Sequence, residues 1–348
     1  MPGRPEAGTP TEEFDYRLPL EAIAQQPPAH RGSSRMLVLG QRNGGRDATV
    51  SQLPRLLQQG DCLVLNDTRV KAARLRGLVG GRAGEVLLLQ ELGAGEYRAL
   101  VRPARLLPPG AELQGPQWQA RVEAAWPGHP GGRRVRLRIR SGLDLEAVGE
   151  VPLPPYLKEP LRDRERYQTV YAQGPPVSAA APTAGLHLTD VLLGEVQDRG
   201  VTLVRVQLEV GLATFAPIRA ETVEAHPMHR ERIHISELAA SQIQASHRRG
   251  GRVVAVGTTA VRCLESRPDG AGGVLPGSEE TALYIRPGHR FQVVQGLLTN
   301  FHQPRSSLLV MVSAFYGRAR VRRAYRTALE NGYHFLSFGD CMFGWAGG

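Results

Sequence analysis

Short hydrophobic runs separated by glycine and proline turns fill the chain between residues 68 and 150. Just before them, residues 61–65 (DCLVL) form a short apolar run after Asp61, which predicts a strand that leads into the polar turn NDTR. The runs that follow read VKAARLRGLVG, GEVLLLQEL, EYRALVRPARLL, WQARVEAAW and RRVRLRIRSG. Because β-rich runs at this spacing are typical of closed all-β domains, we predict a compact β-barrel over residues 68–150.

The pattern changes to α/β after the prolines near residue 152. Helical periodicity predicts helices over residues 161–172, 189–200, 235–251 and 321–332. Extended apolar runs predict strands over 201–211, 252–257 and within 283–300, and glycines predict a flexible loop over 266–279. Because strands and helices alternate, we predict a two-domain α/β protein in which residues 13–67 and 151–348 form one sheet domain around the inserted barrel.

Composition and charge narrow the class of protein. The 348 residues are 41% hydrophobic and 22% charged, which is ordinary for a globular chain of about two domains. Residues 1–12 are small, polar and rich in proline, so we predict a disordered N-terminus without a secretion signal. No run approaches the roughly 20 apolar residues of a membrane span. Cys62, Cys263 and Cys341 lie far apart, which argues against disulfides or a thiolate zinc site, and we expect a cytoplasmic protein.

The formal net charge is +10 and arises from 43 Lys and Arg residues, nearly all of them arginine. Arginine is well suited to bidentate contacts with phosphate and to stacking on bases, so nucleic acid becomes the leading macromolecular partner. The alternative is a compositional bias from a GC-rich genome, because glycine, alanine and proline are also abundant.

The most informative segment for chemistry is LLTNFHQPRSSLLVMVSAFYG, residues 297–317. Asn300, His302, Arg305 and Ser306 lie beside a run apolar enough to be buried, and buried polar groups need defined partners. Pro304 disfavours a helix before it, so a helix beginning just after it would present free N–H groups to an anion. A structural loop capped by Asn300 and Ser306 is the alternative.

Two further blocks lie where strands meet helices, the places at which α/β proteins hold ligands. In APTAGLHL, residues 181–188, Thr183, Gly185 and His187 precede a predicted helix; His187 is a candidate for proton exchange near neutral pH. In VGTTAVR, residues 256–262, the candidates are Gly257, Thr258, Thr259 and Arg262. The second block lacks the lysine of a P-loop and the glycines of a dinucleotide fingerprint. A capping loop with a satisfied histidine, or an ordinary turn, would explain either block alone.

Two more blocks carry carboxylate, aromatic and imidazole groups. EVGLATFAP, residues 209–217, places Glu209 at a strand end and Phe215 where a ring is available for stacking. HPMHRE, residues 226–231, contains His226 and His229, but HxxH without a third ligand and with a proline in between does not predict a metal site.

Together these blocks resemble one family, the S-adenosylmethionine:tRNA ribosyltransferase-isomerases of queuosine synthesis. The resemblance runs from Phe14 to Phe343 in family order. It is carried by FDYRLPLEAIAQQP, RGSSRMLVL, LVLNDTRVKAARLRG, PLPPYL, ERYQTVYA, APTAGLHL, EVGLATFAPIR, HPMHRE, VGTTAVRCLES, YIRPG, LTNFHQPRSSLLVMVSAFYG and YHFLSFGDCMF. APTAGLH together with TNFH-P and VGTT-R is its most specific part.

The resemblance implies that the ribosyl part of S-adenosylmethionine is moved to the aminomethyl group of a deazaguanine at the tRNA wobble position. Adenine and methionine leave, and the product is epoxyqueuosine-tRNA. S-Adenosylmethionine is then a substrate and no cofactor or metal is expected; the oligomeric state stays open, with a monomer as the simplest expectation. The resemblance also implies an α/β domain with an inserted β-barrel.

This chemistry requires a base beside the sulfonium, a proton or hydrogen bonds for the departing adenine, and donors for sugar oxyanions. The candidates for proton transfer are, in order of preference, His187, His302, His226 and His229. The candidates for substrate binding are Thr183, Gly185, Glu209, Phe215, Gly257, Thr258, Thr259, Arg262, Asn300, Arg305, Ser306, Asn66 and Arg69. Asn66 and Arg69 have a turn at the barrel boundary as their alternative.

The chain departs from the family pattern at two places. Where the family typically has His-Val-Gly-x-Gly-Thr-Phe, this chain has Glu209 and Ala213 in place of the histidine and the second glycine. Around the proline of the TNFH block it has Gln303 and Arg305 instead of Leu and Glu. Two alternatives therefore accompany the transferase hypothesis: a tRNA-binding relative with altered catalysis, and an S-adenosylmethionine-dependent RNA methyltransferase.

Overall fold

The computed structural model describes residues 8–40, 45–128, 131–174, 176–211, 214 and 216–347. The chain divides into two compact units, one of Met1–Arg69, Pro154–Gly174 and Ala181–Gly348 and the other of Val70–Leu153 and Pro175–Ala180. The first contains a large mixed sheet and the second a closed barrel, which confirms the predicted fold class. The barrel unit also includes a short segment that the sequence assigned to the α/β domain, because Lys71 N–H donates to the Ser178 carbonyl at 2.9 Å.

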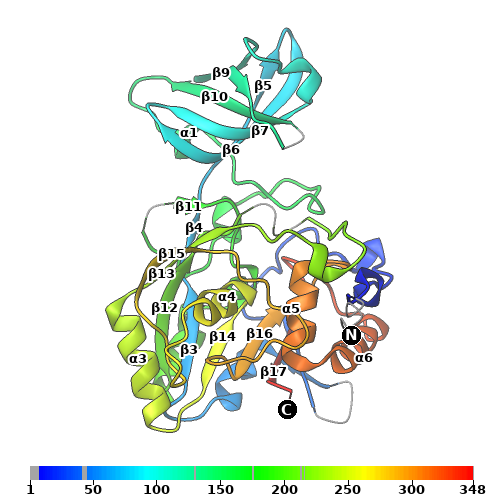
Figure 1. Cartoon of the computed structure of the whole chain (residues 1–348), viewed down its shortest axis with the longest axis vertical. Coiled ribbons are helices and arrows are strands. Elements are labelled where there is room, and N and C mark those ends of the chain that lie inside the picture. The colour runs from blue at the N-terminus through cyan, green and yellow to red at the C-terminus, as the bar shows by residue number, and fades with distance from the viewer. Residues whose placement is uncertain are drawn as a thin grey trace, which may run out of the picture. The chain divides into compact units, whose positions relative to one another are not determined.

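The α/β unit is built on a nine-stranded sheet (Figure 1). In spatial order its strands are β15 (Gly277–Thr281), β13 (Glu231–Ile235), β12 (Thr202–Leu208), β3 (Cys62–Asn66), β14 (Val253–Val256), β16 (Gly296–Asn300), β17 (Cys341–Trp345), β1 (Arg35–Val38) and β2 (Arg46–Thr49). The central strands β12, β3, β14 and β16 are mutually parallel. Their carboxyl ends therefore lie along one edge of the sheet, where a ligand crevice is expected in this class of fold.

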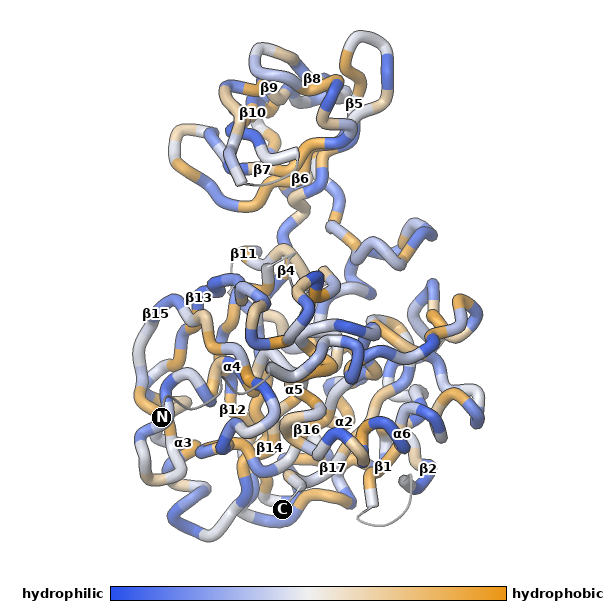
Figure 2. The backbone as a smooth tube through the Cα atoms, turned by 45° about the vertical axis from the view of Figure 1, so that its right-hand side comes forward, coloured by the Kyte–Doolittle hydropathy of each residue, from blue (hydrophilic) through white to orange (hydrophobic). Residues whose placement is uncertain are grey.

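Both faces of the central sheet are covered. Every residue of β3 and β14 is buried, and β14 lies among the hydrophobic stretches of Figure 2. On one face, alternate residues such as Leu63 and Val254 pack against η3 (Val50–Leu56) and α2 (Asp190–Asp198). On the other face lie α3 (Glu237–Arg248) and α4 (Thr258–Ser266), in front of the sheet in Figure 1. The α/β unit is thus three-layered, as the alternation of elements predicted.

Most predicted helices are present. α2 and α3 are capped by the side chains of Thr189 and Ser236, and α6 (Arg318–Glu330) follows α5 (Ser307–Tyr316). The helix predicted over residues 161–172 is wrong, because the structure has only the short 3-10 helix η5 (Arg164–Tyr167) there. Arg31 binds the carbonyl oxygens of Glu165 and Gln168, so those groups serve a tertiary contact instead of a helical ladder.

Other predictions are corrected in detail. Strand β15 begins inside the predicted flexible loop 266–279 because it pairs along β13, and residues 283–295 form no strand among those described. The disordered N-terminus is wrong for residues 8–12: Thr11 is 1% exposed and its N–H donates to the Glu221 carbonyl at 2.8 Å. Residues 1–7 lie outside the described residues.

The barrel unit closes in the order β10-β7-β6-β5-β8-β9. Its strands are β5 (Arg74–Val79), β6 (Arg82–Gly93), β7 (Glu96–Arg102), β8 (Glu112–Gly115), β9 (Trp118–Ala125) and β10 (Gly132–Ile139). The arginine-rich strand β10 is partly neutralised, because Glu96 pairs with Arg134 and Arg136.

The remaining short elements are η1 (Thr11–Phe14), η2 (Leu20–Ala22), η4 (Ala104–Leu106), η6 (Thr183–His187), η8 (Val223–Ala225), α1 (Leu145–Val148), and β4 (Arg69–Val70), which pairs with β11 (Pro176–Ser178).

Among the described residues, no helix is long and apolar enough to cross a membrane.

Candidate functional site

Two small adjoining cavities, of about 30 Å³ each, lie at the carboxyl-end edge of the central strands. They share the lining residues Thr183, Thr214, Asn300, His302 and Leu308. The second cavity is also lined by Gly257, Thr258 and Thr259 at the start of α4. The APTAGLHL, VGTTAVR and TNFHQPRSS segments thus meet here, because β14 and β16 end at the same edge. We call the two cavities together the cleft.

His302 lines both cavities of the cleft. Its Nε2 and the Thr299 hydroxyl share a hydrogen bond of 2.8 Å, and within the described part of the chain its Nδ1 has no partner. Burial lowers the pKa of His302 to about 3, so the imidazole is neutral at pH 7. The backbone on both sides of this ring is also fixed, since its N–H donates to the Tyr325 hydroxyl and its carbonyl accepts from the Tyr16 hydroxyl.

His187 has a different place from the one predicted. It is 3% exposed, and neither cavity includes it among its lining residues. Its Nδ1 bonds the Ser34 hydroxyl at 3.0 Å and its Nε2 lies 3.1 Å from the Asn300 amide nitrogen. Desolvation, reinforced by the charge of Arg31, lowers its pKa to about 4. The structure therefore argues against proton exchange by His187 near neutral pH, because the buried ring lies outside the lining of the cleft and is hydrogen-bonded through both nitrogens; its position suits the orientation of Asn300.

Asn300 presents an unsatisfied acceptor to the cleft. Its amide nitrogen lies 3.0 Å from the Leu336 carbonyl, which only accepts, so the NH₂ group must face Leu336 and His187. The amide oxygen is buried without a partner among the described residues, as is the Thr259 hydroxyl. A buried acceptor without a hydrogen bond costs about 1–3 kcal/mol, and a ligand with hydroxyl or amino donors would offset this cost. Leu336 itself has φ of +71°, a strained conformation of the kind found at functional sites.

Thr214 reaches the cleft from the loop after β12 and is anchored by a buried ion pair. Its hydroxyl donates to the Glu231 carboxylate at 3.1 Å, and the same carboxylate accepts from Gly211 N–H at 2.8 Å. His229 Nε2 lies 3.1 Å from that oxygen, and Arg262 binds the other one. Burial alone raises the pKa of Glu231, but the His229 hydrogen bond and the Arg262 charge outweigh it and lower the pKa.

Arg262 is therefore occupied by the protein. Besides Glu231, its guanidinium donates to the carbonyl oxygens of Leu283, His229 and Thr281 at 3.1, 3.2 and 3.4 Å. It is buried and lines neither cavity. The prediction that Arg262 holds a substrate carboxylate or phosphate is wrong, because its donors are already used to fix the loop that carries Thr214.

Of the predicted binding residues Gly185, Gly257 and Ser306, the first packs against a ring and the other two line the cleft. Gly185 lines neither cavity; a Cβ there would lie 1.8 Å from the Tyr171 hydroxyl, so the glycine admits that ring. Gly257 has φ of +86° and turns β14 into α4. Ser306 lines the cleft and caps α5, accepting from Leu309 N–H at 3.2 Å, so the structural reading of this serine also holds.

Several predicted residues lie outside the lining of the cleft. Asn66 uses its amide to bridge to both backbone groups of Leu208, and Arg69 pairs with Glu165 at 2.6 Å. Arg305 has φ of +54° and its backbone bonds Phe14 and Ile218. Glu209, which is half-buried just after β12, and His226, whose ring contacts Tyr284, also lie outside the lining. The predictions for Phe215 and Ala213 fall outside the described residues.

The cleft also contains residues that sequence reasoning missed. Tyr156 and Ser337 line it and share a hydrogen bond of 2.7 Å, and Thr299 and Thr214 contribute hydroxyls. PLPPYL and YHFLSFGDCMF, two blocks that carry the family resemblance, contain Tyr156 and Ser337, so their position in those blocks was the available signal. Of the departures around the TNFH proline, Gln303 lines the cleft and Arg305 does not.

No three His, Cys, Asp or Glu side chains group as ligands of a metal ion within the described ranges. His226 and His229, the pair considered for a metal, instead serve an aromatic contact and the Glu231 anchor.

Comparisons with known proteins agree with the arrangement of these motifs. A family model described as queuosine biosynthesis protein matches residues 11–343. The S-adenosylmethionine:tRNA ribosyltransferase-isomerase of Moorella thermoacetica is 48% identical over 341 residues, covering 95% of this chain and 98% of that protein. That of Desulforamulus reducens is 44% identical over 335 residues, with coverage of 95% and 98%. The crystal structure of the S-adenosylmethionine tRNA ribosyltransferase of Thermotoga maritima matches with a TM-score of 0.53 at 32% identity, over 95% of this chain and 99% of that one. The chain therefore belongs to the queuosine biosynthesis protein family.

Proposed function

We propose that this protein is an S-adenosylmethionine:tRNA ribosyltransferase-isomerase. It moves the ribosyl part of S-adenosylmethionine to the aminomethyl group of a deazaguanine at the tRNA wobble position and releases adenine and methionine. The proposal is supported by its relatives, which carry this name over nearly the whole chain. The reaction takes place in the cytoplasm, where tRNA is found, and S-adenosylmethionine itself supplies the ribosyl group and the leaving groups without an added cofactor.

The observation that carries the proposal is the pair of buried, unpartnered oxygens in the cleft, Asn300 Oδ1 and Thr259 Oγ1. An amide oxygen accepts and a hydroxyl both donates and accepts, which suits ribose hydroxyls and amino groups. The imidazoles of His187 and His302 are both neutral at pH 7, so neither places a positive charge beside a cationic sulfonium. Such a cleft is electrostatically compatible with S-adenosylmethionine.

Within this proposal the residues take different roles. His302 becomes the first candidate for accepting the sugar proton, because it is the imidazole that lines the cleft with a nitrogen unbound by the described residues. His187 is a positioning residue that orients the Asn300 amide. Thr214, held by Glu231, adds a hydroxyl from the opposite loop.

The test is incubation of the protein with S-adenosylmethionine and tRNA that carries the aminomethyl-deazaguanine. We expect free adenine, free methionine and a matching gain in tRNA mass. S-Adenosylhomocysteine as the product would replace the proposal with a methyltransferase. Binding of tRNA without any release of adenine would replace it with a non-catalytic tRNA-binding protein.

A further inference from the structure

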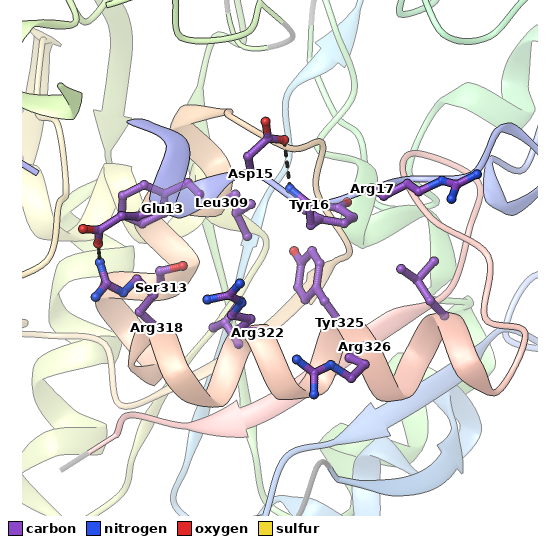
Figure 3. Close-up of a pocket in the computed structure, with 13 residues that line it drawn as sticks. Glu13, Asp15, Tyr16, Arg17, Leu309, Ser313, Arg318, Arg322, Tyr325 and Arg326 are labelled. Carbon is purple, nitrogen blue, oxygen red and sulfur yellow. Dashed lines mark hydrogen bonds and ion pairs between the residues drawn. The ribbon is translucent and has the colours of Figure 1, made fainter. Parts of the chain in front are cut away.

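A second, larger cavity of about 240 Å³ lies in the α/β unit between the N-terminal segment and helices α5 and α6 (Figure 3). Its basic lining residues are Arg17, Arg318, Arg322 and Arg326, and its acidic ones are Glu13 and Asp15. We call it the arginine groove. None of these residues lines the cleft, and nothing in the chemistry assigned to the cleft uses them.

The α6 arginines lie on one side of the helix because they are spaced by four residues. With a rise of 1.5 Å per residue, consecutive members of this row are about 6 Å apart along the axis. Val321 and Tyr325 alternate with them as buried residues, so the row lies at the edge of the packed face. A row of guanidinium groups along a groove suits an extended polyanion better than a single small anion.

Most of this charge is not neutralised by the protein. Arg318 pairs with Glu13, and the Asp15 carboxylate accepts from Tyr16 N–H at 2.8 Å; both contacts are visible in Figure 3. Within the part of the chain that the structure describes, no carboxylate pairs with the exposed side chains of Arg17, Arg322 or Arg326. Three guanidinium groups therefore remain free to bind phosphate in bidentate fashion.

The floor of the groove is directly connected to the cleft. The Tyr16 and Tyr325 rings pack edge to face with centroids 5.2 Å apart, and both line the groove. Their hydroxyls bond the carbonyl and the N–H of His302, whose ring lines the cleft. His302 thus contacts the floor of the groove through its backbone and lines the cleft with its ring, so the two sites share one residue.

We propose that the arginine groove binds the phosphate backbone of the tRNA next to the nucleotide whose base enters the cleft. This inference rests on the proposed function for the identity of the RNA. Arg17, Arg322 and Arg326 contact phosphates, and the Tyr16 and Tyr325 floor keeps the His302 backbone in place while the strand is bound.

The test compares two double variants with the same change in net charge. Arg322→Gln with Arg326→Gln removes two groove arginines. Arg323→Gln with Arg248→Gln removes two exposed arginines that do not line it, one of them from the same helix. Binding of the substrate tRNA is measured by fluorescence anisotropy over a range of salt concentrations, and turnover is measured as adenine release.

Two single-strand phosphate contacts contribute about 1.4 to the slope of log K against log salt. We therefore expect the groove variant to bind tRNA more weakly at low salt and to have a slope shallower by about 1.4. The ratio of the wild-type to the variant binding constant for tRNA should fall about 7-fold between 50 and 200 mM salt, because a slope difference of about 1.4 acts over a fourfold change in salt. The KM for tRNA should rise, while the control variant stays near wild type in both measurements.

The outcomes separate this inference from the proposed function. Equal binding and equal slopes in the two double variants would overturn the groove assignment even if wild type releases adenine. Weaker binding of the groove variant together with no adenine from wild type would support the RNA surface and remove the transferase. Loss of a wild-type dimer in the groove variant, seen by sedimentation, with unchanged tRNA binding would make the groove a protein interface and refute the inference.

Discussion

Replacing Arg262 with methionine removes one charge of a buried ion pair while keeping an unbranched side chain. The Glu231 carboxylate, 5% exposed, would keep its bonds to Gly211 N–H and the Thr214 hydroxyl but lose its cation. The carbonyl oxygens of Leu283, His229 and Thr281 would lose their donor as well. Breaking one partner of a buried pair costs about 3–5 kcal/mol, and we expect Arg262→Met to lower the free energy of unfolding by this amount.

Urea unfolding followed by tryptophan fluorescence measures this loss. The chain has three tryptophans, so a Trp118→Phe, Trp126→Phe background leaves Trp345, on β17 of the α/β unit, as the reporter. With slopes of about 1–3 kcal/mol per molar urea, the midpoint should fall by at least about 1 M. The matched control is Arg232→Met, next to Glu231 in sequence, whose exposed pair with Glu280 at 3.8 Å should be worth less than about 1 kcal/mol.

A double-mutant cycle adds the decisive comparison. The double variant Glu231→Gln, Arg262→Met leaves neither charge buried without its partner. Its loss of unfolding free energy should therefore be about 2 kcal/mol smaller than the sum of the losses in the two single variants. If Arg262→Met costs no more than Arg232→Met, or if the two single losses simply add, the pair does not anchor the Thr214 loop.

Two other predictions concern the cleft and the loop behind it. The pKa of His302 is about 3 against an ordinary value of 6.5, so the unfolded chain binds a proton that the native one does not as pH falls between these values. The contribution of His302 to the free energy of unfolding is therefore fully present above pH 6.5 and is lost as the pH falls toward 3. His302→Gln should flatten the decline of the unfolding free energy with falling pH by up to about 1.4 kcal/mol per pH unit. Equal slopes for wild type and variant between pH 6 and 4 would contradict a neutral buried ring. Gly185→Ala should destabilise by about 1–3 kcal/mol, since its Cβ would overlap the Tyr171 hydroxyl. Adding Tyr171→Phe removes the overlapping hydroxyl and should restore part of that loss. The restoration is only partial, because the Cβ still lies 2.8 Å from the ring Cζ and 2.9 Å from Thr169 Cγ2. If urea unfolding shows no restoration, the hydroxyl is not the obstacle.

The fold was largely predictable because hydrophobic periodicity reports burial directly. The amphipathic α2, α3 and α6 have helical periodicity, and the all-buried β3 and β14 are apolar runs too short for helices and bounded by turn residues. The region around residues 161–172 was not predictable in this way. Its backbone conformation depends on Arg31, more than 130 residues away, which takes the carbonyl oxygens that a helix would need.

The convergence of the cleft loops was predictable from topology, because APTAGLHL, VGTTAVR and TNFHQPRSS stand at element boundaries of an α/β sheet. The roles of individual side chains were not, because those depend on partners distant in sequence. Arg262 has the residue type of an anion-binding group, yet Glu231 on β13 uses its charge. Nothing in the local pattern of VGTTAVR distinguishes a free guanidinium from one that is paired with a buried carboxylate and backbone carbonyl oxygens.

The two histidines show the same limit and what it means for the mechanism. In sequence, His187 and His302 have similar settings, since each follows a threonine-containing block at an element boundary, and His187 is preferred. In the structure, Ser34, 153 residues away, and Asn300 occupy both nitrogens of His187, whereas His302 keeps one nitrogen that no described residue binds and faces the cleft. Because burial makes both rings neutral, what distinguishes them is hydrogen-bond vacancy and not charge. These hydrogen bonds favour the reverse order of preference, with His302 as the candidate for direct proton transfer and His187 as a positioning residue for the Asn300 amide.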